Sequence, residues 1–380
     1  VDRTRPEATV DGRPTRSHRS LAYFAIFDPE RGQGIGNKIS GFLRAAAAEG
    51  WETRSVLRHR PGILEHLRLG TAIASASEQV LVIRSTAHFL AVLVPFCIIA
   101  RLRGRWLVLD VPTPQSAALV ELLKGAYPFP VRVAKALALL LTAGPFVYWP
   151  FHRVIEYAAE GPWWMIGNRA RIRELGNGVD LDSIAPRPSR PAWPTRRLKL
   201  IAVANVSFWH GYDRMLRAMH TFLQRESGDR DIEFTIVGAG EEVDRLKSLA
   251  EELGLSDRVH FRGPLVGAER MEAYCQHHVA VASLGLHRKG LARAAELKAR
   301  EYCAVGIPFI AAGEDVDFPE RVDFRFVVPL SDDSDELASL LDALFQRSEL
   351  PDPKLIRAYA ESHLDMRLKV RQVLDDAITR

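Results

Sequence analysis

The chain has 380 residues, of which 47% are hydrophobic and 26% are charged, a globular composition whose length favours two domains. The formal net charge is +4, and it divides into about +7 for residues 1–185 and about −3 for the remainder. This basic excess suits a phosphorylated ligand or an anionic membrane face, but it lacks the concentrated Lys/Arg stripe of a nucleic-acid binder.

Cysteine usage and the lack of long apolar runs exclude further classes. Cys97, Cys275 and Cys303 are odd in number and show no CxxC or Cys/His spacing. Neither a disulfide framework nor a structural zinc is therefore expected, and a reducing cytoplasm is the natural compartment. Residues 1–19 are rich in Arg and Pro without an apolar run, which we interpret as a disordered leader.

Short apolar runs alternate with helical patterns in residues 20–180. This alternation predicts βα units around a parallel sheet. The expected strands of this half are Leu21–Phe27, Gln79–Ile83, Trp106–Leu109 and Phe146–Tyr148.

Two apolar segments of this half, Phe89–Ala100 and Ala136–Trp149, are shorter than the roughly 18 residues that span a bilayer. We favour buried helices for both. The alternative is a surface that rests on a membrane, because basic residues flank both segments. These are Arg101, Arg103 and Arg105 after the first, and Lys124, Arg132 and Lys135 before the second.

A proline-rich stretch follows. Residues 177–197 contain four prolines and no periodicity, so we expect an interdomain linker at 181–197. A second α/β domain is expected at 198–352, and a helical segment at 353–380. Its predicted strands are Leu198–Val203, Glu233–Val237, Val259–Phe261, Val279–Ala282, Pro308–Ala311 and Phe324–Val328. Two doubly wound domains leave a cleft at the carboxyl ends of their strands, where such sheets bind ligands.

The first strand is followed by the glycine-rich sequence FDPERGQGIGNK. Gly32, Gly34 and Gly36 permit a tight turn in which backbone N–H groups approach a ligand, before a helix expected from Lys38 onward. The dinucleotide fingerprint fails, because its third glycine would fall on Asn37, and no GK[ST] sequence is present. A ligand-contacting loop, with Lys38 as a phosphate contact, is favoured over a flexible turn.

Polar residues follow two other strands. Asp110 and Thr113 stand where the third run ends, so they would orient a hydroxyl or an acceptor; capping of the next helix explains them equally well. His210-Gly211 stands where a loop becomes a helix, so a phosphate would meet an imidazole and free amides. A simple cap is the alternative there. Gly238 belongs to a second glycine turn, which is weak by itself.

The strongest region is residues 283–313. Arg288, Lys289 and Arg293 form a basic loop before a helix expected from about Ala294 to Ala304, with Gly306 as its C-cap. Lys298 and Glu301 lie three residues apart, and so share a face of that helix. A cation suits a diphosphate and a carboxylate suits a ribose diol. An exposed Lys/Glu pair of small energetic value is the alternative.

The run REYCAVGIPFIAAG resembles the donor helix of glycosyltransferase family 4 and its relatives with the GT-B fold. The sequences NGVDLD, VGAGEE and FRG occur in the same order as in that family. The resemblance covers most of residues 198–330 and, more loosely, the glycine loop. It implies two Rossmann-like domains that face across a cleft, with the donor on the second and the acceptor on the first.

The resemblance implies sugar transfer from a nucleoside diphosphate sugar, with retention of configuration and without an obligatory metal or other cofactor. Glu301 matches the glutamate that holds the ribose, and Lys298 matches a basic position near the diphosphate. Gly34 and Gly36 match the family's N-terminal glycine loop.

Two departures mark a divergent member of polysaccharide or glycan-precursor type. Arg293 occupies the place of the family's first glutamate, and His210 takes a lysine-like place before Gly211. The diphosphate cations are therefore expected at other basic positions. The resulting candidates are Lys298, Arg288, His210 and Asp110 as catalytic, Glu301, Gly34, Gly36, Gly211, Gly238, Arg293 and Lys289 as donor-binding, and Lys38 and Thr113 on the acceptor side.

The expected partners are a UDP- or GDP-sugar and a glycan or lipid-linked acceptor, with no nucleic acid. The basic N-terminal half also suggests peripheral contact with the inner face of a membrane. A sugar-nucleotide epimerase, a phosphorylase or a degenerate binding subunit are the alternatives, and Arg293 favours the last. The failed glycine spacing argues against an NAD oxidoreductase.

Overall fold

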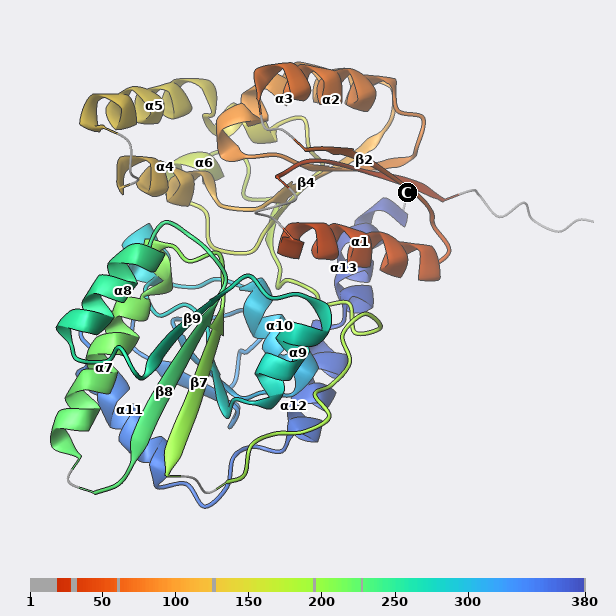
Figure 1. The fold of residues 1–380 in the computed structure, drawn as a ribbon. Helices are drawn as coiled ribbons and strands as arrows, with labels where there is room; N and C mark the ends of the chain where they lie inside the picture. The colour runs from red at the N-terminus through yellow and green to blue at the C-terminus, as the bar shows by residue number, and fades with distance from the viewer. Residues whose placement is uncertain are drawn as a thin grey trace, which may run out of the picture.

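The computed structural model describes residues 19–28, 33–59, 62–124, 128–193, 196–226 and 228–378. Residues 1–18 of the expected leader lie outside these ranges. Two α/β domains lie one above the other, and the chain passes between them through the proline-rich segment (Figure 1).

A parallel sheet of six strands, within the described ranges, forms the N-terminal domain in the order β2-β1-β3-β4-β5-β6. The strands are β1 (Ser20–Ile26), β2 (Glu52–Arg58), β3 (Val80–Arg84), β4 (Trp106–Val111), β5 (Arg153–Glu156) and β6 (Ile172–Glu174). The helices are α1 (Gln33–Ala48), α2 (Ile63–Ser75), α3 (Leu90–Leu102), α4 (Gln115–Lys124), α5 (Phe129–Thr142) and α6 (Pro162–Met165), with 3₁₀ helices η1 (Ala87–Phe89) and η2 (Pro145–Tyr148).

The second domain has a parallel sheet of six described strands in the order β12-β11-β10-β7-β8-β9. The strands are β7 (Arg197–Val203), β8 (Asp231–Val237), β9 (Val259–Gly263), β10 (Val279–Val281), β11 (Phe309–Ala312) and β12 (Arg325–Val328). The helices are α7 (Tyr212–Arg225), α8 (Val243–Glu252), α9 (Gly267–Cys275), α10 (Leu297–Val305) and α11 (Asp335–Phe345), with 3₁₀ helices η3 (Phe208–His210) and η4 (Leu286–Lys289).

The last helices run from the second domain back to the first. They are α12 (Pro353–Tyr359), the π-helical turn η5 (Ala360–Leu364) and α13 (Met366–Ile378). The apolar side of α13 packs beside α1 on the N-terminal sheet, where Met366, Val370 and Leu374 are buried with Tyr23 and Phe42 of that domain (Figure 1). The chain therefore connects the two domains twice.

Each sheet is covered on both faces by a separate apolar cluster, as expected for doubly wound sheets. The predicted fold class is thus confirmed. In both sheets the strand order changes direction beside the first strand of the domain, between β1 and β3 and between β7 and β10. These are the switch points at which open α/β sheets leave a crevice at their carboxyl edge.

One strand prediction in the first domain was wrong, and two strands were not predicted. The run Phe146–Tyr148 is the 3₁₀ helix η2, because Gly144-Pro145 starts a tight turn, and the strand itself is β5. The edge strands β2 and β6 were not expected, because their sequences ETRSVLR and IRE are largely polar. An edge strand pairs with one neighbouring strand only and is more exposed to water than a central strand. Its sequence therefore shows only a weak hydrophobic pattern.

The apolar segments of the first domain form helices, but not fully buried ones. In α3, Leu93, Cys97 and Ala100 are buried, whereas Ile98, Ile99 and Leu102 are exposed. The interpretation as buried helices is therefore correct for one side only. Among the described residues, no helix has the length and apolarity to pass through a bilayer.

Candidate active site

A cavity of about 520 Å³ lies between the carboxyl edges of the two sheets. Both domains line it. The first contributes Arg84 at the end of β3 and residues after β1, β4 and β5, and the second contributes residues at and after the ends of β7 and β8, after β10 and at the start of α10. The predicted cleft is therefore present at both switch points.

Helix α10 is fixed across the switch point of the second sheet by Tyr302. Its buried hydroxyl donates to the carbonyl of Val281 on β10 (3.2 Å) and accepts from the N–H of Val203 on β7 (3.1 Å). Gly306 ends the helix with a φ of 77°, a conformation that glycine adopts without strain. The helix begins at Leu297, three residues later than expected, after Glu296 as N-cap residue.

Lys298 lines the cavity from the first turn of α10. Its Nζ lies 3.3 Å from the hydroxyl of Tyr212 and 3.7 Å from a carboxylate oxygen of Glu296. Burial lowers the pKa of Lys298 to about 8, although Glu296 opposes that shift. Glu296 in turn accepts hydrogen bonds from the backbone N–H and the hydroxyl of Ser283 after β10. The carboxylate that pairs with Lys298 is therefore held in place.

Glu301 lines the cavity one helical turn further on, as the sequence predicted for a residue on the face of Lys298. Its Oε1 accepts from the Tyr274 hydroxyl (2.9 Å) and pairs with Nε of Arg270 (3.1 Å). Both contacts use one carboxylate oxygen, and within the described residues this leaves Oε2 to a ligand. Arg270 and Tyr274 come from α9, and no local pattern in the sequence points to either of them.

His210 lines the cavity opposite α10. Its Nδ1 accepts from the backbone N–H of Ser207 (2.9 Å), so the proton of the neutral ring sits on Nε2. Burial lowers the pKa of His210 well below its ordinary value, and the charges of Lys298 and Lys289 act in the same direction. His210 is thus a neutral ring with one donor N–H.

The predicted glycines have distinct roles in the structure. Gly211 has a φ of 64°, and a Cβ there would lie 2.8 Å from the backbone nitrogen of Gly285, so it allows η3 to approach the loop after β10. Gly238 has a φ of 127°, lines the cavity, and would clash with the carbonyl of Ala204 if it carried a Cβ.

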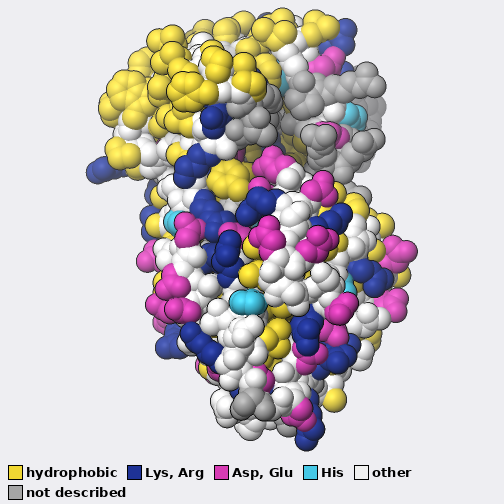
Figure 2. All heavy atoms as spheres, turned by 60° about the vertical axis from the view of Figure 1, so that its left-hand side comes forward, with side chains coloured by type: hydrophobic (Ala, Val, Ile, Leu, Met, Phe, Trp, Pro, Cys, Tyr) yellow, Lys and Arg dark blue, Asp and Glu magenta, His cyan; other side chains and the backbone are white. Residues whose placement is uncertain are grey.

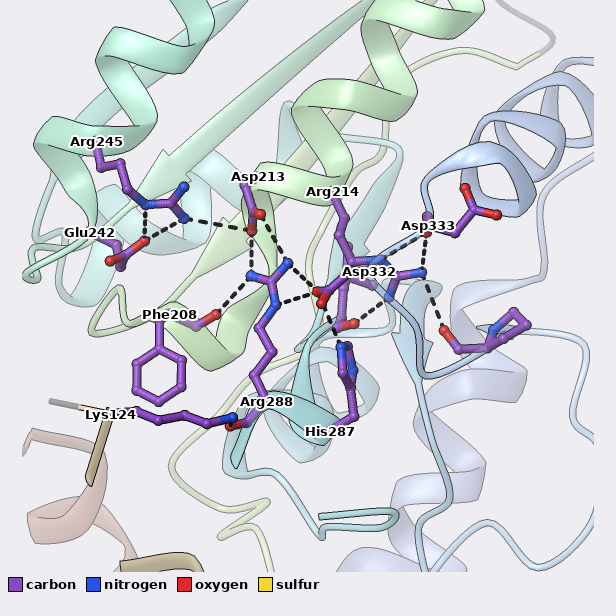
Figure 3. Close-up of polar contacts among 12 residues, drawn as sticks. Lys124, Phe208, Asp213, Arg214, Glu242, Arg245, His287, Arg288, Asp332 and Asp333 are labelled. Carbon is purple, nitrogen blue, oxygen red and sulfur yellow. Dashed lines mark hydrogen bonds and ion pairs between the residues drawn. The ribbon is translucent and has the colours of Figure 1, made fainter. Parts of the chain in front are cut away.

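The basic loop before α10 is largely neutralised within the protein. Arg288 pairs with Asp213 (2.7 Å) and Asp332 (2.7 Å), and it donates to the carbonyl of Phe208 (Figure 3). Burial would lower the pKa of Arg288, but hydrogen bonding and attraction to Asp213 outweigh it and raise the pKa. Arg288 does not line the cavity.

Two other basic candidates contact the N-terminal domain. Lys289 lines the cavity, with its Nζ 4.6 Å from the ring centre of Trp209, and pairs with Glu121 of α4. Arg293 pairs with Glu174 of β6 (2.8 Å) and lies outside the cavity lining. Lys124 of α4 also donates to the carbonyl of Arg288 (2.7 Å), so this loop joins the two domains (Figure 3).

The opposite wall contains a buried polar cluster. Lys38 Nζ lies 3.2 Å from Asp110, Arg84 donates to the same carboxylate (2.9 Å), and the hydroxyl of Tyr23 also donates to it. Burial would raise the pKa of Asp110, but Arg84 and Lys38 outweigh it and lower the pKa. Asp110 lies below the cavity surface, whereas Lys38 and Arg84 line it.

Lys38 has an additional aromatic neighbour. Its Nζ lies 3.5 Å from the ring centre of Tyr157, which also lines the cavity. Burial lowers the pKa of Lys38 to about 7, against the opposing effect of Asp110. Two cations thus share one carboxylate, which leaves this wall positive and suited to an anion while Lys38 is protonated. Sequence reasoning missed Arg84, although it directly ends β3.

The glycine loop differs from its prediction. Helix α1 starts at Gln33 rather than at Lys38, so Gly34 and Gly36 belong to its first turns. Gly34 lines the cavity beside Leu297 of α10, whereas Gly36 faces Phe27 and does not line it. Gly32 lies outside the described residues. Thr113, between Pro112 and Pro114, lines the cavity from the end of β4 as expected.

Comparisons with known proteins agree with this geometry. Residues 197–347 match the family model of glycosyl transferases group 1. A search of curated protein sequences found no match.

Solved structures of similar fold cover nearly the whole chain. A sucrose-phosphate synthase from Thermosynechococcus elongatus is 15% identical with a TM-score of 0.65, over 95% of this chain and 100% of that one. A glycosyltransferase from Rickettsia africae ESF-5 is 13% identical with a TM-score of 0.61, over 94% and 97%. The apo form of the lipopolysaccharide outer core galactosyltransferase WaaB is 11% identical with a TM-score of 0.58, over 95% and 99%. The chain therefore has the GT-B fold, and its second domain is similar to glycosyl transferases group 1.

Proposed function

We propose that this protein transfers a sugar from a nucleoside diphosphate sugar to a hydroxyl acceptor, with retention of configuration and without an obligatory metal. The observation that carries the proposal is the cluster of Lys298, Glu301 and His210 at the switch point of the second sheet. A carboxylate, a cation and a neutral N–H donor line the same cavity there. These groups match the ribose and the diphosphate of such a donor.

The donor would lie along α10. Oε2 of Glu301 accepts hydrogen bonds from the ribose hydroxyls, while Tyr274 and Arg270 hold the carboxylate through Oε1. The diphosphate then meets Lys298, one turn nearer the start of the helix. Gly238 lets the chain after β8 pack against the carbonyl of Ala204 at the wall of the donor cavity, because it carries no side chain.

Catalysis would be mainly electrostatic. As the bond between the anomeric carbon and the phosphate oxygen breaks, negative charge grows on the diphosphate. Lys298 and the Nε2–H of His210 are fixed by their contacts with Tyr212 and Ser207, so they stabilise that charge without reorganising. Removal of one such preorganised donor typically costs about 10²–10³ in rate.

The proton of the acceptor hydroxyl would be transferred on the same face of the sugar from which the diphosphate leaves. The acceptor hydroxyl oxygen forms the new bond to the anomeric carbon, and its proton passes to the departing phosphate oxygen. The nucleoside diphosphate leaves with that proton, and the configuration is retained. No protein nucleophile is required.

The acceptor would enter against the first domain. Thr113 offers a hydroxyl, and Lys38 and Arg84 give that wall a positive charge. A glycan, a lipid-linked sugar or a small molecule that carries a phosphate near its reacting hydroxyl would suit it. The free thiols of Cys97, Cys275 and Cys303 accord with a reducing compartment, so we place the reaction in the cytoplasm or at the inner face of a membrane, in polysaccharide or glycan-precursor synthesis.

The test is a thermal-shift screen with UDP-, GDP-, ADP- and dTDP-sugars, followed by an assay with the best donor and a panel of hydroxyl acceptors. A ligand at 100 times its Kd stabilises the folded state by about 2.7 kcal/mol, so micromolar binding is visible. We expect one donor to raise Tm and release its nucleoside diphosphate only when an acceptor is glycosylated.

Other products would contradict the proposal. An isomerised sugar nucleotide without release of diphosphate would identify an epimerase. Nucleotide-independent glycan binding without turnover would identify a degenerate binding subunit, which Arg293 at the place of the first glutamate would then explain.

A further inference from the structure

The exposed apolar side chains of this protein are concentrated on one domain. Among the described residues, 16 of the 19 large hydrophobic side chains with high exposure lie between residues 63 and 166. Leu102 on α3 is 83% exposed and Leu141 on α5 is 79% exposed. Monomeric proteins rarely expose a continuous apolar patch without an interaction partner. The uneven distribution therefore points to a surface with a function.

These side chains form one surface, which we call the apolar face. It consists of the outward sides of α2, α3 and α5 and the segment from η2 to α6. They gather over the end of the N-terminal domain that faces away from the second domain (Figures 1 and 2). Arg101 at the end of α3 donates to the carbonyls of Trp149 and Pro150, which joins α3 to the segment after α5. These hydrogen bonds hold two parts of the apolar face in a fixed position relative to each other.

The surface charges of this region are predominantly basic. Residues 85–173 contain ten Lys and Arg residues but four Asp and Glu residues. Asp110, Glu156 and Glu160 are buried, and Glu121 pairs with Lys289 of the second domain. Arg103 and Arg169 are exposed among the basic residues, whereas Lys124 contacts the second domain through the carbonyl of Arg288. On α2, the one acid, Glu65, pairs with Arg68.

This charge pattern favours a lipid surface over a protein partner. Protein interfaces surround their apolar centre with polar groups that are complementary to the partner, and a second copy of this chain would bring two basic rims together at a cost in free energy. An anionic leaflet is negative everywhere, so it complements a basic rim at any rotation. The exposed indoles of Trp149 and Trp163 suit the headgroup region.

We propose that the apolar face inserts into the headgroup region of an anionic bilayer and holds the N-terminal domain on the membrane. Apolar side chains of α2, α3 and α5 enter the acyl boundary, and the arginines and lysines contact lipid phosphates. Membrane binding of this kind is independent of the reaction in the cleft.

The test is flotation of the whole protein with vesicles of phosphatidylcholine, with and without phosphatidylglycerol. Leu102→Glu/Leu141→Glu places charges in the apolar face, and Leu355→Glu is the matched control, since Leu355 is 68% exposed on α12 of the second domain. We expect binding to the anionic vesicles, a loss of about tenfold or more in the double variant, and no change in the control. High salt should weaken binding.

A second variant and a second measurement make each outcome decisive. Arg103→Glu/Arg169→Glu leaves the apolar side chains in place and should also lower binding to anionic vesicles about tenfold. No vesicle binding by the wild-type protein, equal binding to neutral vesicles, or unchanged binding of the variants would overturn the proposal. So would light scattering that showed a dimer dissociated by Leu102→Glu/Leu141→Glu, because a second copy would then cover the apolar face.

Discussion

The proposed chemistry needs Lys298 in its protonated form, but the buried environment of this side chain favours loss of the proton. Burial brings its pKa to about 8, compared with 10.5 for an ordinary lysine. The charged form is therefore complete only below that pH, and it is lost as the pH rises. His210 has the opposite character, because its low pKa keeps it neutral, so it contributes an N–H donor rather than a charge.

For Lys298→Met we expect kcat to fall about 10²–10³-fold, because a preorganised cation next to the leaving group is removed. The measurement is release of nucleoside diphosphate under saturating donor. Lys354→Met on α12, an exposed lysine of the same domain, is the control and should keep wild-type kcat. A Lys298→Met enzyme with wild-type kcat would remove this residue from the mechanism.

The pH profile gives a separate test of the same group. Since protonated Lys298 is the active form, kcat/KM for the donor should fall as the pH rises through about 8. Lys298→Arg should move that fall to higher pH, because a guanidinium keeps its proton. Lys354→Arg should leave the profile unchanged. A fall at the same pH in Lys298→Arg would assign the titration to another group.

Glu156 is a buried acid that the proposed reaction does not use. Its Oε1 has no hydrogen-bond partner among the described residues, and burial, together with Glu160 and Glu174, raises its pKa to about 9. The folded protein therefore binds this proton more tightly than the unfolded chain. Its contribution to stability is complete below about pH 4.5 and is lost as the pH rises towards 9.

Glu156→Gln should consequently stabilise the fold by about 1–3 kcal/mol at pH 8, because the amide is neutral at every pH. The free energy of unfolding, measured in urea at pH 5 and at pH 8, should depend less on pH in the variant. Glu251→Gln, at an exposed position on α8, should behave as wild type. Equal pH dependence in Glu156→Gln and the wild-type protein would contradict this account.

Individual site residues were predictable from the sequence where one element supplies them. Lys298 and Glu301 share a face of one helix, and helical spacing alone places them together. Arg270 and Arg84 line the cavity from other elements of the chain, and buried Tyr274 holds Glu301 from behind it. Nothing in local periodicity predicts such contacts, because the topology of the sheets brings them together.

At the scale of elements, the turn between η3 and α7 shows why a glycine is required. Gly211 combines a left-handed φ with a close approach to Gly285, and each requires the absence of Cβ. Gly254, at the end of α8, has a similar φ of 67°, but a Cβ there would meet no atom within 4 Å. Comparison of the two positions therefore distinguishes the cost of a left-handed backbone from the additional cost of a steric clash.

Gly211→Ala should destabilise the protein by about 2–4 kcal/mol, and Gly254→Ala by about 1 kcal/mol, because only the first also forces backbone atoms apart. Urea unfolding of both variants gives the comparison. An equal loss in the two would mean that the loop after β10 shifts freely to accept the added methyl group.

Element boundaries were less predictable than element types. The six strands of the second domain were confirmed. Its four central strands, β7, β8, β10 and β11, appear as apolar runs because both of their faces are covered. The expected strand Phe146–Tyr148 was wrong, because Gly144-Pro145 directs the chain into a 3₁₀ turn. Helix α1 began earlier than expected, since its glycines are tolerated within the helix.

At the scale of the whole molecule, the alternation of apolar runs and helices predicted two doubly wound domains. The sequence did not predict which acidic residue pairs with each basic residue around the cleft. Arg288 satisfies Asp213 and Asp332, Arg293 satisfies Glu174, and Lys289 pairs with Glu121. A sequence shows that these side chains are basic, but the carboxylates that neutralise them come from other elements, and two of them from the other domain.

The central claim is that the cleft binds a nucleoside diphosphate through α10. Titration calorimetry of UDP, GDP, ADP and dTDP with the wild-type protein and with Glu301→Gln tests it most directly. We predict that one nucleotide binds, that Glu301→Gln weakens it about tenfold or more through the ribose contact, and that exposed Glu252→Gln does not. Absence of binding by all four, or equal affinity in Glu301→Gln, would contradict the account.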